Sequence, residues 1–206
     1  MPFFDGVSGR VHYRTWAVEA PAAVLAFLHG SRQHTGNYHR FARASNARGI
    51  EVWALDHVGH GLSEGDPDQL APLSDLAENA WQLVELARKG RPVVLMGHSL
   101  GSATALVALQ SKAAGIAAAV LCGTPKSVVT LRAPAIPTLL VHGVDDRLAP
   151  MDPIREWVDR QTGVELREYV DAGHDLLHEP VHSVVTADVA EFVLGRNVRS
   201  GHADPA

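Results

Sequence analysis

The chain of 206 residues is 46% hydrophobic and 20% charged, which predicts one globular domain of ordinary composition. Its formal net charge of −5 argues against the basic face that nucleic acids or anionic membranes require, and its single cysteine, Cys122, excludes an intrachain disulfide. The first residues lack a signal-peptide pattern, and no apolar stretch approaches the roughly 18 residues of a membrane span. We therefore expect a cytoplasmic protein with no integral membrane association.

The predicted elements begin with a short strand around residues 11–16, which follows a glycine-containing turn at Gly6–Gly9 and indicates an antiparallel hairpin. From Val24 onward, short apolar runs alternate with segments of helical periodicity. The runs typical of strands buried on both faces are Val24–Leu28, Glu51–Leu55, Val93–Met96, Ala117–Leu121, Thr138–Val141 and Val164–Tyr169. The helices expected between them are approximately Tyr38–Arg48, Leu73–Lys89, Leu100–Lys112, Pro153–Gln161 and His182–Leu194.

This alternation predicts an α/β fold, a mostly parallel sheet with helices on both faces. The clearest helix, Leu73–Lys89, has apolar residues at helical spacing and ends in two cations followed by Gly90, a typical helix stop. We expect a single domain over residues 1–206, with a core of about residues 7–195 and a flexible polar tail over residues 196–206.

The most informative segment is Gly97-His98-Ser99-Leu100-Gly101, which directly follows an apolar strand and directly precedes an alanine-rich helix. A strand-to-helix turn this tight leaves no room for side chains two residues before and after the serine, and it raises the serine hydroxyl above the sheet. The turn also leaves the Leu100 N–H at a helix N-terminus, where it can stabilise an oxyanion. We predict that Ser99 is a nucleophile for acyl transfer.

A base and an acid are expected in loops that follow later strands, in the chain order serine, acid, histidine. The strand Thr138–Val141 leads to Asp145 and Asp146, and either carboxylate fits the acid. The strand Val164–Tyr169 leads to His174, which we predict to be the base. A neutral imidazole is needed to take the serine proton, and a carboxylate on its other nitrogen fixes the tautomer.

With these residues placed, the chain resembles the α/β-hydrolase superfamily and, within it, the monoacylglycerol lipase-like serine hydrolases. The resemblance implies Asp146 as the acid, because the family's acid lies three residues after the Gly of its His-Gly motif. It also implies the backbone N–H of Ser31 as the second oxyanion donor, beside that of Leu100. The segments that carry the resemblance are Leu28-His29-Gly30-Ser31 with His34, Gly36 and Tyr38, then Asp56–Gly65, Gly97–Gly101, His142-Gly143 with Asp146-Arg147, and Gly173-His174.

One departure from the family is large. Relatives usually insert a cap of several dozen residues between the strands that correspond to Ala117–Leu121 and Thr138–Val141. Here the connection runs only from Cys122 to Pro137. The comparison therefore implies a cap domain that is minimal or absent and a lidless, open site. A smaller departure is Ser102, where relatives often carry glycine.

The stretch His178-Glu179-Pro180-Val181-His182 matches the His-Glu-x-x-His pattern of zinc proteases. That chemistry needs both histidines on one face of a continuous helix, and Pro180 fits the first turn of a helix better than its middle. We therefore expect no metal site. We also interpret His29, His57, His60 and His142 as structural, Asp56 as tying its loop down through backbone N–H bonds, and Cys122 as a small buried hydrophobe.

The triad and the resemblance together predict an esterase similar to monoacylglycerol lipase. Its partner is a small-molecule ester with a small or medium acyl chain, and it needs no cofactor. A thioesterase, a perhydrolase and an aminopeptidase share the triad, and a non-catalytic binding module is the alternative from another class. An aminopeptidase should hold its substrate's ammonium with acidic residues. We expect a homodimer to shield an apolar patch left by the missing cap. The residues expected to line the site are His29, His98, Leu148 and Leu176.

Overall fold

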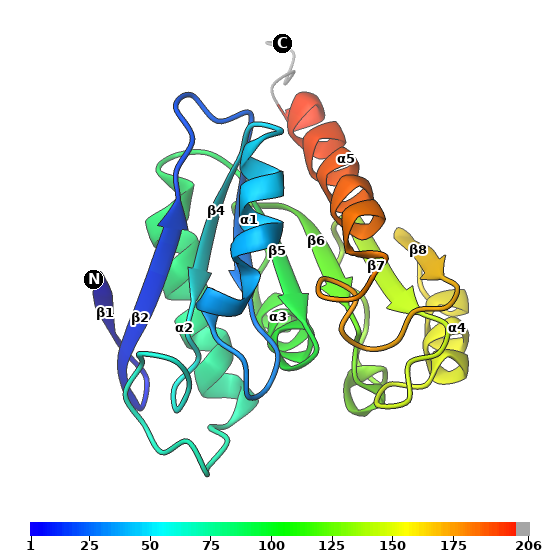
Figure 1. Ribbon diagram of the computed structural model, residues 1–206, viewed down its shortest axis with the longest axis horizontal. Coiled ribbons are helices and arrows are strands. Elements are labelled where there is room, and N and C mark those ends of the chain that lie inside the picture. Colours follow the sequence, from blue (N-terminus) through cyan, green and yellow to red (C-terminus); the bar gives the residue numbers. More distant parts are fainter. Residues whose placement is uncertain (201–206) are drawn as a thin grey trace.

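The computed structural model describes residues 1–200, which form an eight-stranded, mostly parallel sheet (Figure 1). β1 and β2 form an antiparallel hairpin, β2 pairs antiparallel with β4, and all other pairs are parallel. The spatial order is β1-β2-β4-β3-β5-β6-β7-β8. The strands are β1 Phe3–Gly6, β2 Gly9–Trp16, β3 Ala23–Leu28, β4 Ile50–Leu55, β5 Val93–His98, β6 Ile116–Cys122, β7 Thr138–Gly143 and β8 Val164–Tyr169. The predicted sheet and its N-terminal hairpin are confirmed.

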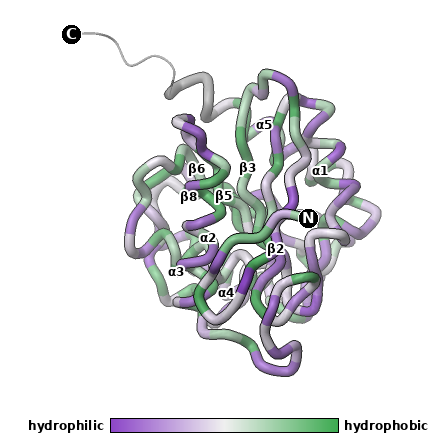
Figure 2. Tube along the Cα trace, turned by 90° about the vertical axis from the view of Figure 1, so that its left-hand side faces the viewer, coloured by the Kyte–Doolittle hydropathy of each residue, from purple (hydrophilic) through white to green (hydrophobic). Residues whose placement is uncertain are grey.

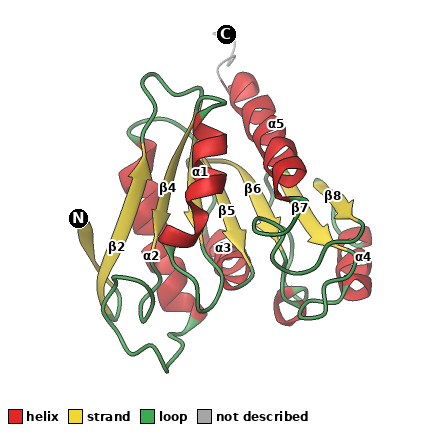
Figure 3. Cartoon of the chain, in the orientation of Figure 1, coloured by secondary structure: helices red, strands yellow, loops and turns green. Residues whose placement is uncertain are grey.

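Helices cover both faces of this sheet, with α1 and α5 on one face and α2 and α3 on the other (Figures 1 and 3). The α-helices are α1 His39–Asn46, α2 Leu73–Arg88, α3 Leu100–Ser111, α4 Met151–Asp159 and α5 His182–Ser200, and the 3-10 helices are η1 Thr35–Tyr38 and η2 Lys126–Val128. α5 continues past Leu194, into the segment expected to be a tail. Residues 201–206 lie outside the described residues.

Two hydrophobic cores lie on the two faces of the sheet. The strand β3 shows the division, because alternate side chains point to opposite faces. Val24 and Leu28 pack with residues of α2 and α3, whereas Leu25 and Phe27 pack with residues of α1 and α5. Figure 2 shows the apolar central strands inside a more polar outer layer of helices and loops. Burial on both faces explains why the central strands read as continuous apolar runs.

The helix α2 ends as its sequence indicates, with two consecutive residues in the left-handed region. Lys89 has φ 41° and Gly90 has φ 81°. Glycine takes this conformation without the Cβ clash that other residues meet, which makes it a helix stop. None of the described helices is both long enough and apolar enough to cross a membrane.

The connection between β6 and β7 is short and carries no cap domain. Residues 123–137 contain only the single-turn η2. Ser102, the other departure from the family, donates to or accepts from Thr124 at 2.8 Å between the two hydroxyl oxygens, and both side chains are fully buried. This bond ties the start of the short connection to the first turn of α3.

Candidate active site

The sequence around Ser99 folds into a strained turn between β5 and α3. Ser99 has φ 51° and ψ −111°, an unusual conformation for a residue with a side chain. A Cβ on Gly97 would lie 2.1 Å from the Gly101 carbonyl, and a Cβ on Gly101 would lie 2.1 Å from the Leu28 carbonyl oxygen. Both glycines are therefore required for the helix to approach the sheet this closely.

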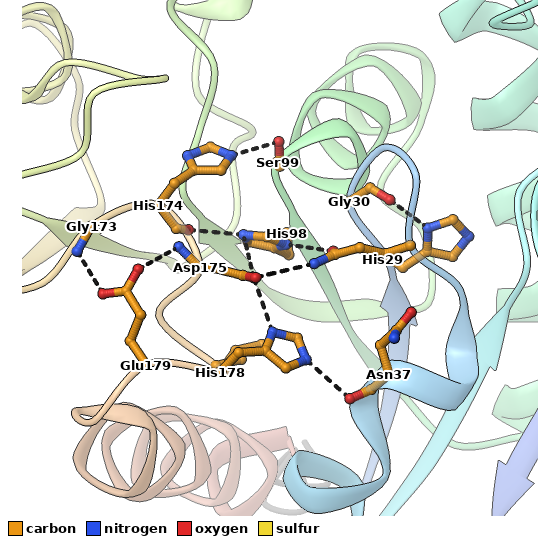
Figure 4. Close-up of polar contacts among 12 residues, drawn as sticks. His29, Gly30, Asn37, His98, Ser99, Gly173, His174, Asp175, His178 and Glu179 are labelled. Atoms are coloured by element: carbon orange, nitrogen blue, oxygen red, sulfur yellow. Dashed lines mark hydrogen bonds and ion pairs between the residues drawn. The ribbon is translucent and has the colours of Figure 1, made fainter. Parts of the chain in front are cut away.

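Three predicted side chains meet at this turn. His174 Nε2 lies 2.8 Å from Ser99 Oγ, the contact drawn in Figure 4, and His174 Nδ1 lies 2.7 Å from Asp146 Oδ2. Both distances are within hydrogen-bonding range, and the imidazole bridges the hydroxyl and the carboxylate. The Ser99 side chain is partly exposed and His174 is 16% exposed, so a small molecule can reach both. The arrangement has the chemistry of an activated serine nucleophile.

Asp146 is held as a carboxylate. Its Oδ1 accepts hydrogen bonds from the N–H groups of Leu148 at 2.9 Å and Ala149 at 2.8 Å, and its Oδ2 faces His174. Burial raises the pKa of Asp146, but the hydrogen bonds from His174 and Ala149 together outweigh burial, so the pKa falls below its ordinary value. Asp145, which the residue pattern alone left as an alternative, is exposed and does not contact His174.

Acid and base meet because the loops after β7 and β8 lie side by side. The Val144 N–H donates to the Tyr169 carbonyl, and the Asp145 N–H donates to the Ala172 carbonyl, both at 2.9 Å. A Cβ on Gly143 would lie 2.1 Å from the Gly173 carbonyl oxygen. The glycine of the His-Gly motif thus allows the two loops to touch, which sets the distance between Asp146 and His174.

The two expected oxyanion donors have free backbone N–H groups. Among the described residues, neither the Ser31 N–H nor the Leu100 N–H has a hydrogen-bond acceptor. Ser31 lies in the oxyanion loop, which we define as residues 29–34, directly after β3. Asp56 steadies this region, because its carboxylate accepts from the Thr35 N–H at 2.7 Å and the Leu62 N–H at 3.0 Å. The predicted role of Asp56 is confirmed.

The four residues expected to line the site differ in position. Leu148 is 75% exposed and follows the acid, whereas Leu176 is fully buried in the core beneath α5 and does not line an open site. Leu176 was expected near substrate because it lies two residues after His174, but the chain turns inward there and Leu176 packs in the core. His29 is buried, and its Nε2 accepts from the His57 N–H at 2.8 Å. His98 is also buried, and its ring contacts the backbone of the base loop, which we define as residues 170–178.

The remaining histidines act mostly as structural residues. His142 Nε2 donates to the Ala149 carbonyl at 2.7 Å, and His60 Nδ1 lies 3.1 Å from the Val58 carbonyl. His57 is different, because neither ring nitrogen has a polar partner among the described residues. Its ring instead packs edge-on against His29, and burial lowers its pKa well below the usual value.

The His-Glu-x-x-His stretch does not form a zinc-binding helix. His178 and Glu179 lie in turns before α5, and His182 is the first residue of that helix. Glu179 accepts hydrogen bonds from the N–H groups of Gly173 at 2.6 Å and Asp175 at 2.9 Å, one on each side of His174 (Figure 4). Residues 1–200 hold no cluster of three or more side chains suited to a metal ion. The motif supports the base loop.

Cys122 is the small buried hydrophobe that the sequence suggests. It is fully buried, and burial raises the pKa of its thiol above the ordinary range. Its backbone carbonyl accepts a hydrogen bond from the Ser99 N–H at 2.9 Å. The end of β6 therefore supports the turn between β5 and α3, which we call the nucleophile turn.

A profile of one protein family, described as serine aminopeptidase S33, matches residues 19–131, more than half of the chain. The chain belongs to this family of hydrolases. The matched region contains Ser31, Ser99 and Leu100 but ends before Asp146 and His174. The profile therefore does not test Asp146 and His174, which are brought together with Ser99 by the geometry described above.

Relatives and solved structures agree with this family. The chain is 29% identical to the monoacylglycerol lipase of Mycolicibacterium smegmatis over 269 aligned positions, covering 93% of this chain and 95% of the relative. The alignment is longer than the chain, so the relative has residues without a counterpart here. Human monoglyceride lipase is 31% identical, but the match covers 64% of this chain and 46% of the human protein.

Solved structures show the same fold. Est1E from Butyrivibrio proteoclasticus, with ferulic acid bound, has a TM-score of 0.82 at 17% identity, and the match covers 96% of this chain and 100% of Est1E. A soluble variant of Saccharomyces cerevisiae monoglyceride lipase, bound to a substrate analogue, has a TM-score of 0.80 at 14% identity and covers 95% and 94%. The sequence-based fold is confirmed as an α/β-hydrolase fold.

Proposed function

We propose that this hydrolase cleaves carboxylic esters through an acyl-enzyme on Ser99, with His174 as general base and Asp146 as the orienting acid. The observation that carries the proposal is the continuous contact from Ser99 Oγ to His174 Nε2 and from His174 Nδ1 to Asp146 Oδ2, at 2.8 and 2.7 Å. The relatives named monoacylglycerol lipase support an ester substrate.

Each group has one task in this mechanism. Ser99 Oγ attacks the ester carbonyl while its proton moves to His174 Nε2, and the oxyanion that forms accepts the Ser31 and Leu100 N–H groups. His174 then gives that proton to the leaving alcohol, which leaves the acyl group on Ser99. His174 then takes a proton from a water molecule as its oxygen attacks the acyl-enzyme. As the bond between the acyl group and Ser99 Oγ breaks, His174 gives that proton to Ser99 Oγ, and the carboxylic acid departs. The ionised Asp146 fixes the tautomer of His174 throughout.

Small or medium acyl chains are the proposed substrates, because the site has little to enclose a long one. The connection of residues 123–137 is too short for a cap, and the relative's additional residues agree with the loss of one. A pocket of about 270 Å³ lies against the oxyanion loop. Its lining residues are Ser31, Arg32, His60, Pro67, Asp68 and Leu70.

The proposal is tested with p-nitrophenyl esters from acetate to palmitate. Wild type is compared with Ser99→Ala and with Ser111→Ala, which changes the exposed serine at the other end of α3. We expect turnover that is highest for short or medium chains, is lost in Ser99→Ala and is retained in Ser111→Ala. A maximum at palmitate would contradict the proposed chain length. Activity that survives in Ser99→Ala would contradict the nucleophile.

The same purified protein can be used to test two other functions. The name of the family favours an aminopeptidase as second candidate, and amino-acid p-nitroanilides test it. Cleavage of anilides with no cleavage of esters would establish that reaction. A fluorophosphonate probe that fails to label Ser99 in folded protein would indicate a binding module instead.

We also propose that the protein works in the cytoplasm as a homodimer that shields the uncapped site. Three exposed leucines support the shared surface, because they follow β4 and β7 at the edge where the site lies. They are Leu62, Leu70 and Leu148, with exposed fractions of 47, 59 and 75%. Sedimentation velocity should show a dimer at micromolar concentration, and a monomer throughout that range would contradict it.

A further inference from the structure

We propose that a hydrogen-bonded ring built on His98 positions the base loop against the oxyanion loop and thereby sets the catalytic rate. The ring joins three segments: the base loop with His174, the turn between β5 and α3 with Ser99, and the oxyanion loop with Ser31. This inference rests on the proposed function, because it assigns positioning residues to the same site. None of the ring's side chains touches the substrate carbonyl in the mechanism above.

The first contact joins the nucleophile turn to the base. His98, the residue before Ser99, is 2% exposed, and its Nε2 lies 2.9 Å from the backbone carbonyl oxygen of His174 (Figure 4). A carbonyl oxygen only accepts, so Nε2 carries the proton and donates it. The bond thus fixes the backbone of the residue whose imidazole must face Ser99.

The second contact joins His98 to the oxyanion loop. Because Nε2 carries the proton of the neutral ring, Nδ1 is an acceptor, and the Tyr38 hydroxyl lies 2.9 Å from it. Gln33 Oε1 lies 3.2 Å from the same Nδ1, and the single proton of the Tyr38 hydroxyl is shared between these two acceptors. The hydroxyl oxygen also accepts the Gly30 N–H at 3.4 Å. Tyr38 is 1% exposed, so water does not compete for the hydrogen bonds of its hydroxyl.

The ring is closed by a contact between the two loops themselves. Gln33 Nε2 donates to Asp175 Oδ1 at 3.2 Å, and Asp175 is the residue after His174. His178 Nδ1 lies 2.9 Å from Asp175 Oδ1, and this hydrogen bond lowers the pKa of Asp175 to about 2. The Asp175 side chain is therefore an ionised carboxylate that only accepts hydrogen bonds. It therefore orients the Gln33 amide with its nitrogen toward the base loop and its oxygen toward Tyr38.

The backbone beside the ring leaves no free space. A Cβ on Gly30 would lie 2.6 Å from Gln33 Oε1 and 2.9 Å from His98 Nδ1. The ring therefore packs directly against the backbone that precedes Ser31. A shift of the base loop is transmitted through His98 and Tyr38 to the oxyanion loop, and the two halves of the site keep their relative position.

A positioning role has a kinetic signature. Displacement of a reacting group by about 1 Å can cost on the order of 100-fold in rate, although the substrate is still bound. Loss of the ring should thus lower kcat and leave KM nearly unchanged, since the surfaces that contact the bound ester remain. A role in folding alone would lower the amount of folded enzyme, and the kcat of each folded molecule would stay the same.

Two substitutions of His98 provide the test, with p-nitrophenyl butyrate as substrate. His98→Gln keeps an N–H donor near the position of Nε2, and with it the bond to the His174 carbonyl, but loses the acceptor that faces Tyr38. His98→Asn keeps a polar atom near the position of Nδ1 and loses the bond to His174, so the pair isolates the contact that holds the base. We expect kcat to fall at least about tenfold in His98→Asn, to stay within about threefold in His98→Gln, and KM to change less than about twofold in both. Equal losses in the two variants, or a loss expressed in KM, would overturn the proposal.

A third variant decides the matter if a His98 variant does not fold. Gln33→Met keeps the length of a half-buried side chain and removes its contacts with Asp175, Tyr38 and His98. An unchanged kcat in Gln33→Met overturns the ring, and a reduced kcat with unchanged KM supports it. Failure of wild type to hydrolyse any ester or to react with the fluorophosphonate probe would refute the proposed function itself, which is a different result.

Discussion

At the scale of single residues, Asp146 and Asp145 are neighbours with the same charge and different surroundings. Asp146 contacts His174 at 2.7 Å and accepts two backbone N–H groups, whereas Asp145 is exposed. We predict that Asp146→Asn lowers kcat for p-nitrophenyl butyrate about 10³- to 10⁴-fold, because the amide no longer selects the tautomer that leaves His174 Nε2 free to accept. Asp145→Asn is the matched control and should keep its activity. A loss in both variants would show that charge near the loop matters, and not the contact with His174.

The meeting of Ser99 and His174 was predictable at this scale because local order carries the information. A glycine two residues on each side of Ser99 and a histidine after the last strand need no knowledge of distant contacts. The contact that closes the ring around His98 was not predictable in this way. Gln33 and Asp175 are 142 positions apart, and no pattern in either segment indicates that they meet.

At the scale of elements, the approach of two strand-end loops sets the geometry of the acid and the base. We predict that Gly143→Ala lowers kcat at least about 100-fold or prevents folding, because its Cβ would overlap the Gly173 carbonyl and separate the loops. Gly163→Ala is a suitable control, since Gly163 precedes β8, has φ 78° and has no atom within 4 Å of an added Cβ. It should lose roughly 1 kcal/mol of stability from the left-handed conformation alone and keep its kcat. Urea unfolding and initial rates of both variants provide the measurement. Full activity in Gly143→Ala would refute this account.

A second contact at this scale concerns the short connection that replaces a cap. We predict that Thr124→Val lowers the free energy of unfolding by about 1 to 2 kcal/mol, because the buried Ser102 hydroxyl loses its partner. Ser102→Ala combined with Thr124→Val should recover part of that loss, since both polar groups are then removed. Urea unfolding of wild type and the two variants tests this, and equal stability of Thr124→Val and wild type would contradict it.

Elements themselves were the most predictable part of the molecule. The strand Val164–Tyr169 was expected with the bounds that it has, and the start of α3 follows from its tight turn. Helix ends were less predictable. α5 continues to Ser200, although the sequence after Leu194 is mostly polar and gives no apolar pattern to follow. Leu176 shows the limit of such patterns. An apolar residue after the base fits a site wall and a core position equally well, and only the packing of α5 decides between them.

At the scale of the whole molecule, buried histidines make stability depend on pH. Burial lowers the pKa values of His29 and His98 to about 4, and it lowers those of His57 and His142 as well. As pH falls below the ordinary value of about 6.5, the unfolded chain binds protons on all four rings, and the folded protein does not protonate His29 and His98 until near pH 4. Stability is therefore lost as pH falls through this window. His178 opposes the trend, because its bond to Asp175 raises its pKa.

The size of the effect makes it measurable by urea unfolding at pH 7.5, 6 and 5. A folded pKa of about 4 costs about 2 kcal/mol of stability at pH 5 for each of His29 and His98, a large share of the roughly 5 to 15 kcal/mol of a typical domain. The unfolding midpoint should fall steadily over this range. His98→Gln should flatten the dependence, because one ring that the unfolded state protonates is gone. A midpoint that is constant or rises toward pH 5 would mean that the folded protein protonates these rings as readily as the unfolded chain, and the buried histidines would then have to be water-accessible.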